Sequence, residues 1–151
     1  MTMLKLSRKT LLALEAVIDI AFNARPEPVQ AKEITARQGV PQRYLEQVMQ
    51  QLVRAGVLKG VRGPRGGYRL ARERRRISIG DVVRVAESID DDMESAEPRS
   101  ALGTQIVTPL IATLQEEVMA KLDAISIEDL CTRARTAGID CGGGVSADFT
   151  I

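Results

Sequence analysis

The sequence predicts a mainly α-helical protein with one small β-hairpin. Apolar residues recur at helical spacing through most of the 151 residues, and they are aliphatic, because only 3% of the chain is aromatic and it has no Trp. Two short runs of strand-forming residues flank a glycine- and arginine-rich turn in the stretch 57–71, which is the pattern of a hairpin with an exposed tip. The elements around this hairpin determine which kind of domain it belongs to.

Three helices are predicted before the hairpin. Ser7 caps the first helix, at residues 8–23, and Gly39 stops the second, at residues 30–38. The third helix begins at Pro41, and its apolar stripe consists of Leu45, Val48, Met49 and Leu52. Two helices joined by so short a turn and followed by a hairpin predict a winged helix-turn-helix domain over residues 1–86.

The third helix also has a polar face. This face consists of Gln42, Arg43, Glu46, Gln47, Gln50, Gln51 and Arg54. In the major groove of DNA, glutamine can pair with adenine, arginine with guanine, and glutamate can accept a hydrogen bond from cytosine. The face is therefore a candidate for reading bases, and an ordinary soluble helix surface is the alternative.

The hairpin tip is polar and basic. It contains Arg62, Gly63, Pro64, Arg65 and Gly66. Glycines allow the backbone to approach a surface closely and proline stiffens the turn, so the tip suits a nucleic-acid groove, with a solvated turn as the alternative. The arginines that follow, Arg72 and Arg74–Arg76, fit phosphate contacts and a solvated connector equally well.

Charge is divided between the two halves of the chain. The net charge is +1, but residues 1–76 carry 16 Lys and Arg against 6 Asp and Glu, whereas residues 77–151 carry 5 against 14. A basic half built around a hairpin favours polyanion binding. The chain contains no His, the commonest general base, and no recognisable nucleophile motif, so we do not expect an enzyme.

The second half predicts an accessory helical unit. Ser78 and Asp81 cap a fourth helix, and the acid-rich composition that starts at Glu87 predicts a loop over residues 87–101. Residues 102–137 then form a long helix and a final helix capped by Ser126, and residues 138–151 form a flexible, glycine-rich tail.

The long helix carries an apolar residue at every fourth position. These residues are Leu102, Ile106, Leu110, Leu114, Val118 and Leu122. The stripe is longer than the preceding domain needs to close its core, so it implies a partner helix. Pro109 either kinks this helix or starts its main part with Thr108 as the cap.

Neither a membrane span nor a signal peptide is expected. No apolar run approaches the ~18 residues of a span, and residues 1–7 lack a long apolar segment. We therefore expect a cytoplasmic protein.

Two sequence motifs resemble a known family. The strings YLEQ at Tyr44–Gln47 and RGPRGGY at Arg62–Tyr68, in this order of elements, resemble the bacterial Rrf-two family of winged-helix transcriptional regulators. This family includes an iron-sulfur cluster regulator, a nitric-oxide-sensing repressor and a cysteine-metabolism repressor. The resemblance implies a homodimeric, sequence-specific DNA-binding protein, most simply a repressor, that reads a two-fold symmetric operator of double-stranded DNA.

The resemblance also implies roles for individual residues. Glu46 and Gln47 match positions that contact base edges, Arg43 matches a further contact, and Arg62 matches the wing arginine that enters the minor groove. The stripe from Leu102 to Leu122 matches the dimerisation helix. The expected DNA-binding set is Gln42, Arg43, Tyr44, Glu46, Gln47, Arg54, Arg62, Gly63, Pro64, Arg65 and Gly66.

The chain departs from the family pattern in its cysteines. Members that bind a cluster place three cysteines between the fourth helix and the dimerisation helix, and residues 87–103 contain none. We therefore expect no cofactor and no metal, as in the cluster-free, cysteine-metabolism branch. Cys131 is expected to be buried and Cys141 exposed. The alternatives are a redox- or metal-responsive regulator that uses these two cysteines, or a winged helix that only docks proteins.

The end of the chain resembles a peptide ligand. The residues Asp148, Phe149, Thr150 and Ile151 follow three glycines, so an apolar tip with a carboxylate is carried on a tether. This tail is similar to the isoleucine-ending tail with which serine acetyltransferase enters cysteine synthase, which makes cysteine synthase a candidate partner. A tail that packs on its own dimer or stays mobile is the alternative.

Overall fold

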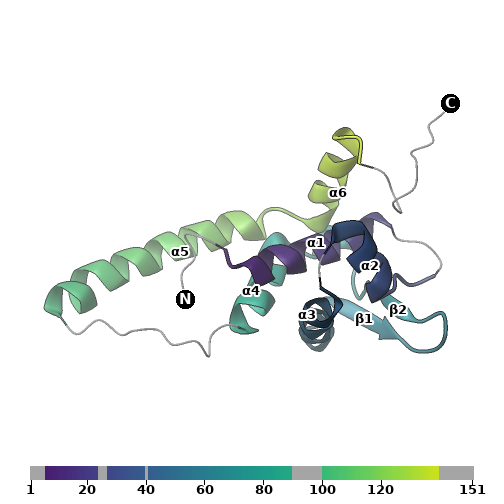
Figure 1. Cartoon of the computed structure of the whole chain (residues 1–151). Helices are drawn as coiled ribbons and strands as arrows, with labels where there is room; N and C mark the ends of the chain where they lie inside the picture. Colours follow the sequence, from purple (N-terminus) through teal and green to yellow (C-terminus); the bar gives the residue numbers. More distant parts are fainter. Residues whose placement is uncertain (1–5, 24–26, 40, 90–99, 140–151) are drawn as a thin grey trace.

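The computed structural model describes residues 6–23, 27–39, 41–89 and 100–139. It is mostly helical with one antiparallel hairpin, so the predicted fold class is confirmed (Figure 1). In chain order the elements are α1 Arg8–Phe22, α2 Ala31–Gln38, α3 Gln42–Arg54, β1 Leu58–Val61, β2 Gly67–Leu70, the 3-10 turn η1 Arg74–Arg76, α4 Ile79–Ile89, the π-helical turn η2 Gly103–Val107, α5 Thr108–Asp123 and α6 Ile127–Thr136. Within the described part of the chain, no helix has the length and apolar character that a membrane span requires.

Helices α1, α3 and α4 enclose the aliphatic core. The four apolar residues predicted for the stripe of α3 are all buried. Ser7 caps α1, because its Oγ accepts a hydrogen bond from the Thr10 backbone at 3.2 Å. Gly39 ends α2 in the left-handed conformation at φ 68°, as the sequence predicts.

A buried ion pair joins α1 to α2. The carboxylate of Asp19 accepts two hydrogen bonds from Arg37, at 2.9 Å from Nε and 2.6 Å from Nη2. Gln38 donates a third at 2.8 Å. The Asp19 side chain is 1% exposed and that of Arg37 is 16% exposed, so the pair holds α2 against α1 from inside the domain.

The hairpin is fastened to the segment that precedes α2. Its register pairs Leu58 with Leu70 and Val61 with Gly67. Val29 and Tyr68 form an isolated bridge with backbone hydrogen bonds of 2.9 and 2.7 Å. A side chain at Gly67 would collide with the Val29 carbonyl, so glycine is required for this close approach.

Helix α4 includes the first residue of the predicted acidic loop. Ser78 and Asp81 cap it reciprocally with two hydrogen bonds of 3.0 Å. The acidic loop expected from residue 87 onwards begins later, since Glu87 lies in the helix and is buried. Its Oε2 accepts hydrogen bonds from the hydroxyls of Thr10 and Ser7, which explains how an acidic residue belongs to this helix. The acidic stretch 90–99 lies outside the described residues.

Helix α5 continues η2 and extends away from the body of the protein (Figure 1). The chain is helical from Ala101 to Asp123, so Pro109 does not start a new helix. Thr108 has helical dihedral angles and its side chain caps nothing. Because Pro109 lacks a backbone N–H, the preceding turn cannot keep its regular ladder, and it adopts the wider π-helical pattern there.

Helix α6 returns the chain to the base of α4. Ser126 and Asp129 form the predicted cap, with hydrogen bonds of 2.9 and 3.1 Å. The Ile127 backbone donates to the Ile77 carbonyl at 2.8 Å, and Ile79 donates to the Ile125 carbonyl at the same distance. The segments before α4 and before α6 are thereby joined side by side.

Candidate nucleic-acid interface

The polar face of α3 is exposed. Its exposed members are Gln42, Arg43, Glu46, Gln47, Gln50 and Arg54, whereas Gln51 is half-buried. The opposite, apolar face is buried against α1, α2 and α4, so the rotation of α3 about its axis is fixed by the core. The fold therefore presents the predicted base-reading side chains together on one surface.

Two contacts order this surface further. Gln42 Nε2 donates to Glu46 Oε2 at 3.1 Å, which positions the Glu46 carboxylate along the helix. Burial, and next the negative charge of Glu46, raise the pKa of Tyr68 on β2. Helix α3 also contacts β1 directly, so the polar face of the helix and the hairpin are adjacent.

Tyr44 connects α3 to the beginning of α1. It is half-buried and packs against the core, and the Nζ atom of Lys9 lies 5.5 Å from the centre of its ring. This is the geometry of a cation–π contact. Tyr44 therefore packs α3 against the core and also borders the candidate DNA surface.

The tip of the wing is exposed and its backbone is constrained. Arg62, Gly63, Pro64 and Arg65 are exposed, while Gly66 is half-buried. Gly63 has φ 112°, and a side chain at Gly66 would collide with the Val61 carbonyl, so this turn depends on both glycines. The Gln30 side chain donates to the Pro64 carbonyl at 3.4 Å. This contact ties the tip to the start of α2.

Three of the four arginines that follow the wing, Arg72, Arg74 and Arg75, lie near acidic side chains. Arg74 Nε lies 2.6 Å from Glu128 on α6, and Arg72 lies 3.8 Å from Asp81. Arg75 lies 3.9 Å from Glu73. Of the two interpretations left open by the sequence, these pairs favour the connector over phosphate contacts.

The apolar stripe of α5 divides into two parts. Leu102, Ile106 and Leu110 are 72%, 59% and 55% exposed, and Leu114 is 38% exposed. Val118 and Leu122 are half-buried, and Leu122 packs against the core of its own chain. The open part of the stripe is therefore shorter than the sequence suggested, because its C-terminal end closes the core beside α4.

The residues of this chain do not fit an iron-sulfur cluster. Such clusters take four protein ligands, mostly thiolates, and the whole sequence has two Cys and no His. Cys131 is buried in α6, and burial raises the pKa of its thiol although the nearby Arg74 guanidinium acts in the opposite direction. No group of three His, Cys, Asp or Glu with metal-binding geometry exists among the residues that the structure describes. Cys141 and the tail Asp148–Ile151 lie outside them.

Several contacts at the site were not foreseen from the sequence. The Asp19–Arg37 pair, the Gln30 contact with Pro64 and the approach of Lys9 to Tyr44 all join residues of different elements. No local signal in the sequence indicated these pairings, because the partners are far apart in the chain.

The geometry defines a class of protein: a winged-helix, DNA-binding regulator with an exposed recognition helix and a basic wing. The family model Rrf2, described as an iron-dependent transcriptional regulator, matches residues 6–133. The chain therefore belongs to the Rrf2 family of transcriptional regulators, and the resemblance carried by the YLEQ and RGPRGGY motifs is confirmed. The family consists of regulators and not of enzymes.

Relatives and solved structures agree with this assignment. The chain is 36% identical over 129 residues to the HTH-type transcriptional regulator IscR of Aliivibrio salmonicida, which covers 84% of this chain and 77% of that protein. The structure of T. potens IscR has a TM-score of 0.71 and 32% identity, covering 90% of this chain and 92% of that one. The structure of CymR, the global cysteine regulator of B. subtilis, has a TM-score of 0.70 and 31% identity, covering 87% and 98%.

Proposed function

We propose that the protein is a homodimeric, sequence-specific repressor that works without an iron-sulfur cluster. The observation that carries the proposal is the exposed polar face of α3 beside a constrained basic wing, on a fold shared with Rrf2 regulators. Helix α3 enters the major groove, where Glu46 and Gln47 contact base edges and Arg43 adds a further contact. Arg62 enters the adjacent minor groove, and a bound repressor excludes other proteins from the same DNA.

Dimerisation follows from the open stripe of α5. Leu102, Ile106, Leu110 and Leu114 are exposed side chains on a helix that projects from the body. In an isologous dimer, the same stripe of two chains is buried together. Two recognition helices are then related by a two-fold axis, so the operator is a two-fold symmetric sequence.

Selection from a random DNA library tests this function. The purified full chain is expected to enrich a two-fold symmetric sequence, and its affinity for that sequence should fall steeply with salt, because cationic contacts release counterions. Enrichment of no sequence, or binding that does not depend on salt, would contradict a DNA-reading function and leave a protein-docking winged helix instead.

The absence of a cluster has a separate test. The family description and the IscR relatives favour an iron-responsive protein, whereas the donor set of this chain does not supply the ligands. We expect protein purified without oxygen to be colourless and its DNA binding to be indifferent to iron. A visible absorbance band with stoichiometric iron and sulfide would overturn this expectation. A change in DNA affinity on thiol oxidation would favour the alternative in which Cys131 and Cys141 respond to redox state.

A second candidate concerns the signal. The likeness to the cysteine regulator CymR supports control of cysteine-metabolism genes, and the tail ending in Ile151 supports cysteine synthase as a partner. In this proposal Ile151 fills an apolar pocket of the enzyme and its carboxylate takes the place of the substrate carboxylate. Calorimetry with cysteine synthase is expected to detect binding that O-acetylserine displaces. Binding that persists after deletion of Ile151 would refute the role of the tail.

A further inference from the structure

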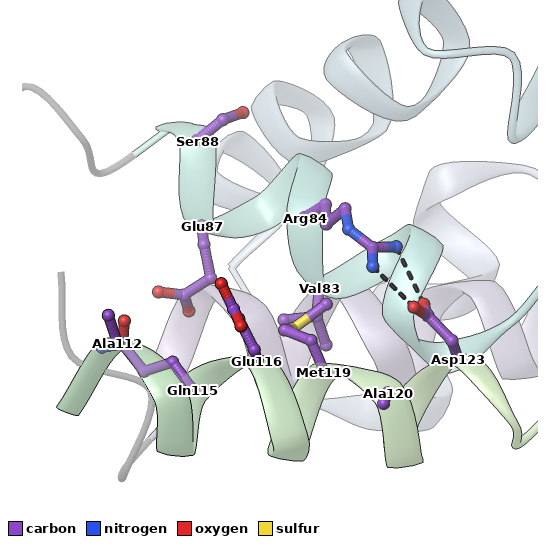
Figure 2. A pocket seen from close by; sticks show the side chains of 10 residues that line it. All are labelled: Val83, Arg84, Glu87, Ser88, Ala112, Gln115, Glu116, Met119, Ala120 and Asp123. Carbon is purple, nitrogen blue, oxygen red and sulfur yellow. Dashed lines mark hydrogen bonds and ion pairs between the residues drawn. The ribbon is translucent and has the colours of Figure 1, made fainter. Parts of the chain in front are cut away.

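A cavity of about 570 Å³ lies between α4 and α5 (Figure 2). Its apolar wall includes Val83, Met119 and Ala120. At one end, Glu87 from α4 and Glu116 from α5 extend into the space between the two helices. Ligand pockets typically have volumes of about 300 to 1,000 Å³ and combine an apolar wall with a few polar groups, so the cavity has the size and composition of a small-molecule site.

Glu87 is the unusual member of this lining. The residue is 6% exposed, and its Oε2 accepts hydrogen bonds from the hydroxyls of Thr10 and Ser7. No Lys or Arg of the described chain forms an ion pair with it. Buried carboxylates are normally paired with a cation, because an unpaired charge loses its hydration without compensation. A cation in the cavity would supply the missing partner.

The basic residue in the lining does not neutralise these acids. Arg84 donates two hydrogen bonds to Asp123, at 2.8 and 2.6 Å. This contact raises the pKa of Arg84 and lowers the pKa of Asp123. The two charged groups therefore stabilise each other as an ion pair. Figure 2 shows the pair at the end of the cavity opposite to Glu87. Glu87 and Glu116 therefore leave the cavity acidic.

A second copy of the chain that packs on the α5 stripe would not fill this cavity. In an α-helix each residue is rotated by about 100° from the last, so residues two apart lie about 200° apart around the axis. Leu114 is two residues from both Ala112 and Glu116, which line the cavity. A partner helix that covers the stripe at Leu114 therefore lies on the other side of α5 and leaves the cavity open.

We propose that this cavity binds a small organic cation, an ammonium or guanidinium group carried on a short apolar body. The charged group lies between the carboxylates of Glu87 and Glu116, and the apolar body lies against Val83, Met119 and Ala120. Binding itself does not depend on DNA. Its use as a signal rests on the proposed function, because α4 belongs to the DNA-binding unit and α5 carries the dimerisation stripe.

Calorimetry of the full chain with three matched probes tests the proposal. Phenethylamine combines an ammonium group with an apolar body, 2-phenylethanol is its neutral counterpart, and 3-phenylpropionate carries the opposite charge. We expect phenethylamine to bind at least about tenfold more tightly than the other two, which corresponds to about 1.4 kcal/mol. Two results would overturn the proposal. One is no detectable binding of phenethylamine at about 10 mM, which corresponds to a dissociation constant weaker than the millimolar range. The other is equal binding of all three probes.

Substitutions then locate the binding. Glu116→Gln removes one carboxylate from the cavity and should weaken phenethylamine binding about fivefold or more. Glu117→Gln is the matched control, because it makes the same change at the next residue, which does not line the cavity. Equal affinities of these two variants would refute the site. Glu87→Gln keeps an acceptor for Thr10 and should also weaken binding, and circular dichroism monitors whether this variant folds.

A mobility-shift assay with and without phenethylamine separates this proposal from the proposed function. DNA binding without the probe tests the function alone. Calorimetry without DNA tests the cavity alone. A probe that binds the wild-type chain and changes its DNA affinity, but not that of Glu116→Gln, would support both.

Discussion

The N-terminal unit, residues 6–89, buries its apolar side chains, whereas much of α5 exposes them. In the N-terminal unit Leu45, Met49 and Leu52 are buried and the polar residues of α3 face outward. In α5 the apolar residues Leu102 and Ile106 face outward. The first arrangement is complete within one chain, whereas the second is completed only by another surface. The DNA-reading unit thus buries its apolar side chains within one chain, whereas the exposed part of the α5 stripe does not.

The largest effect is expected from a substitution that disrupts the dimer and leaves the fold of each protomer intact. Leu110→Asp should weaken dimerisation at least about 100-fold, because each protomer loses a buried leucine worth about 1.5 to 3 kcal/mol and places a charge in the interface. Sedimentation equilibrium measures the change. Ala112→Asp is the control, since residue 112 lies on the opposite side of the same turn. If both variants stayed dimeric, the stripe would not be the interface.

The next largest effect is a loss of stability in the DNA-binding unit. Asp19→Ala should lower the free energy of unfolding by about 3 kcal/mol or more, because it leaves the mostly buried Arg37 without its close partner. Urea denaturation measures the loss. Glu15→Ala, an exposed residue one turn earlier on α1, should change stability by less than about 0.5 kcal/mol. Similar losses in the two variants would mean that the pair contributes little.

Substitutions on the reading surface should change binding and leave folding and assembly intact. Replacing Glu46 or Gln47 by Ala should alter base preference by about 1 to 3 kcal/mol per contact. Arg62→Ala should weaken binding chiefly at sites with a narrow minor groove. Competition assays with single-base operator variants distinguish the two phenotypes. Arg75→Ala is the control, because Arg75 lies in the connector, and an equal loss there would place the connector on the DNA.

The smallest effect concerns the contact that joins the two regions. Asp123→Asn should destabilise the protein by about 0.5 kcal/mol at neutral pH, because the Arg84–Asp123 pair is exposed and screened by water. The pKa of Asp123 is lowered in the folded state, so this contribution is present above its ordinary value of 3.8 and is lost as the pH falls through the folded value. Thermal melts of both proteins should therefore converge in acid. A difference that persists there would exclude this carboxylate as its source.

Local signals in the sequence predicted several helices and helix ends. The stripe of α3, the cap at Ser7, the stop at Gly39 and the cap of Ser126 with Asp129 depend on residues within a few positions of each other. For the same reason the exposed face of α3 was predictable, since a buried stripe fixes the opposite face.

Contacts between distant elements were not predictable in this way. Acidic composition suggested that the loop starts at Glu87, but hydroxyls of Ser7 and Thr10, nearly 80 positions earlier, receive that carboxylate inside the fold. Leu122 belongs to the stripe by its spacing, yet it packs on the core of its own chain because α5 ends beside α4. Spacing identifies an apolar face and does not say which surface covers it.

The base of α5 is held to the body by specific contacts. Two backbone hydrogen bonds of 2.8 Å next to the helix, and the contact of Arg84 with Asp123, fix the point where it leaves the body. The helical stretch from residue 101 to residue 123 is about 34 Å long at 1.5 Å per residue. A rotation of about 5° at the base therefore displaces the far end by about 3 Å, close to the ~3.4 Å step between base pairs. In a dimer joined along these helices, a change of a few degrees at the base would therefore shift the spacing of the two reading heads by about one base-pair step.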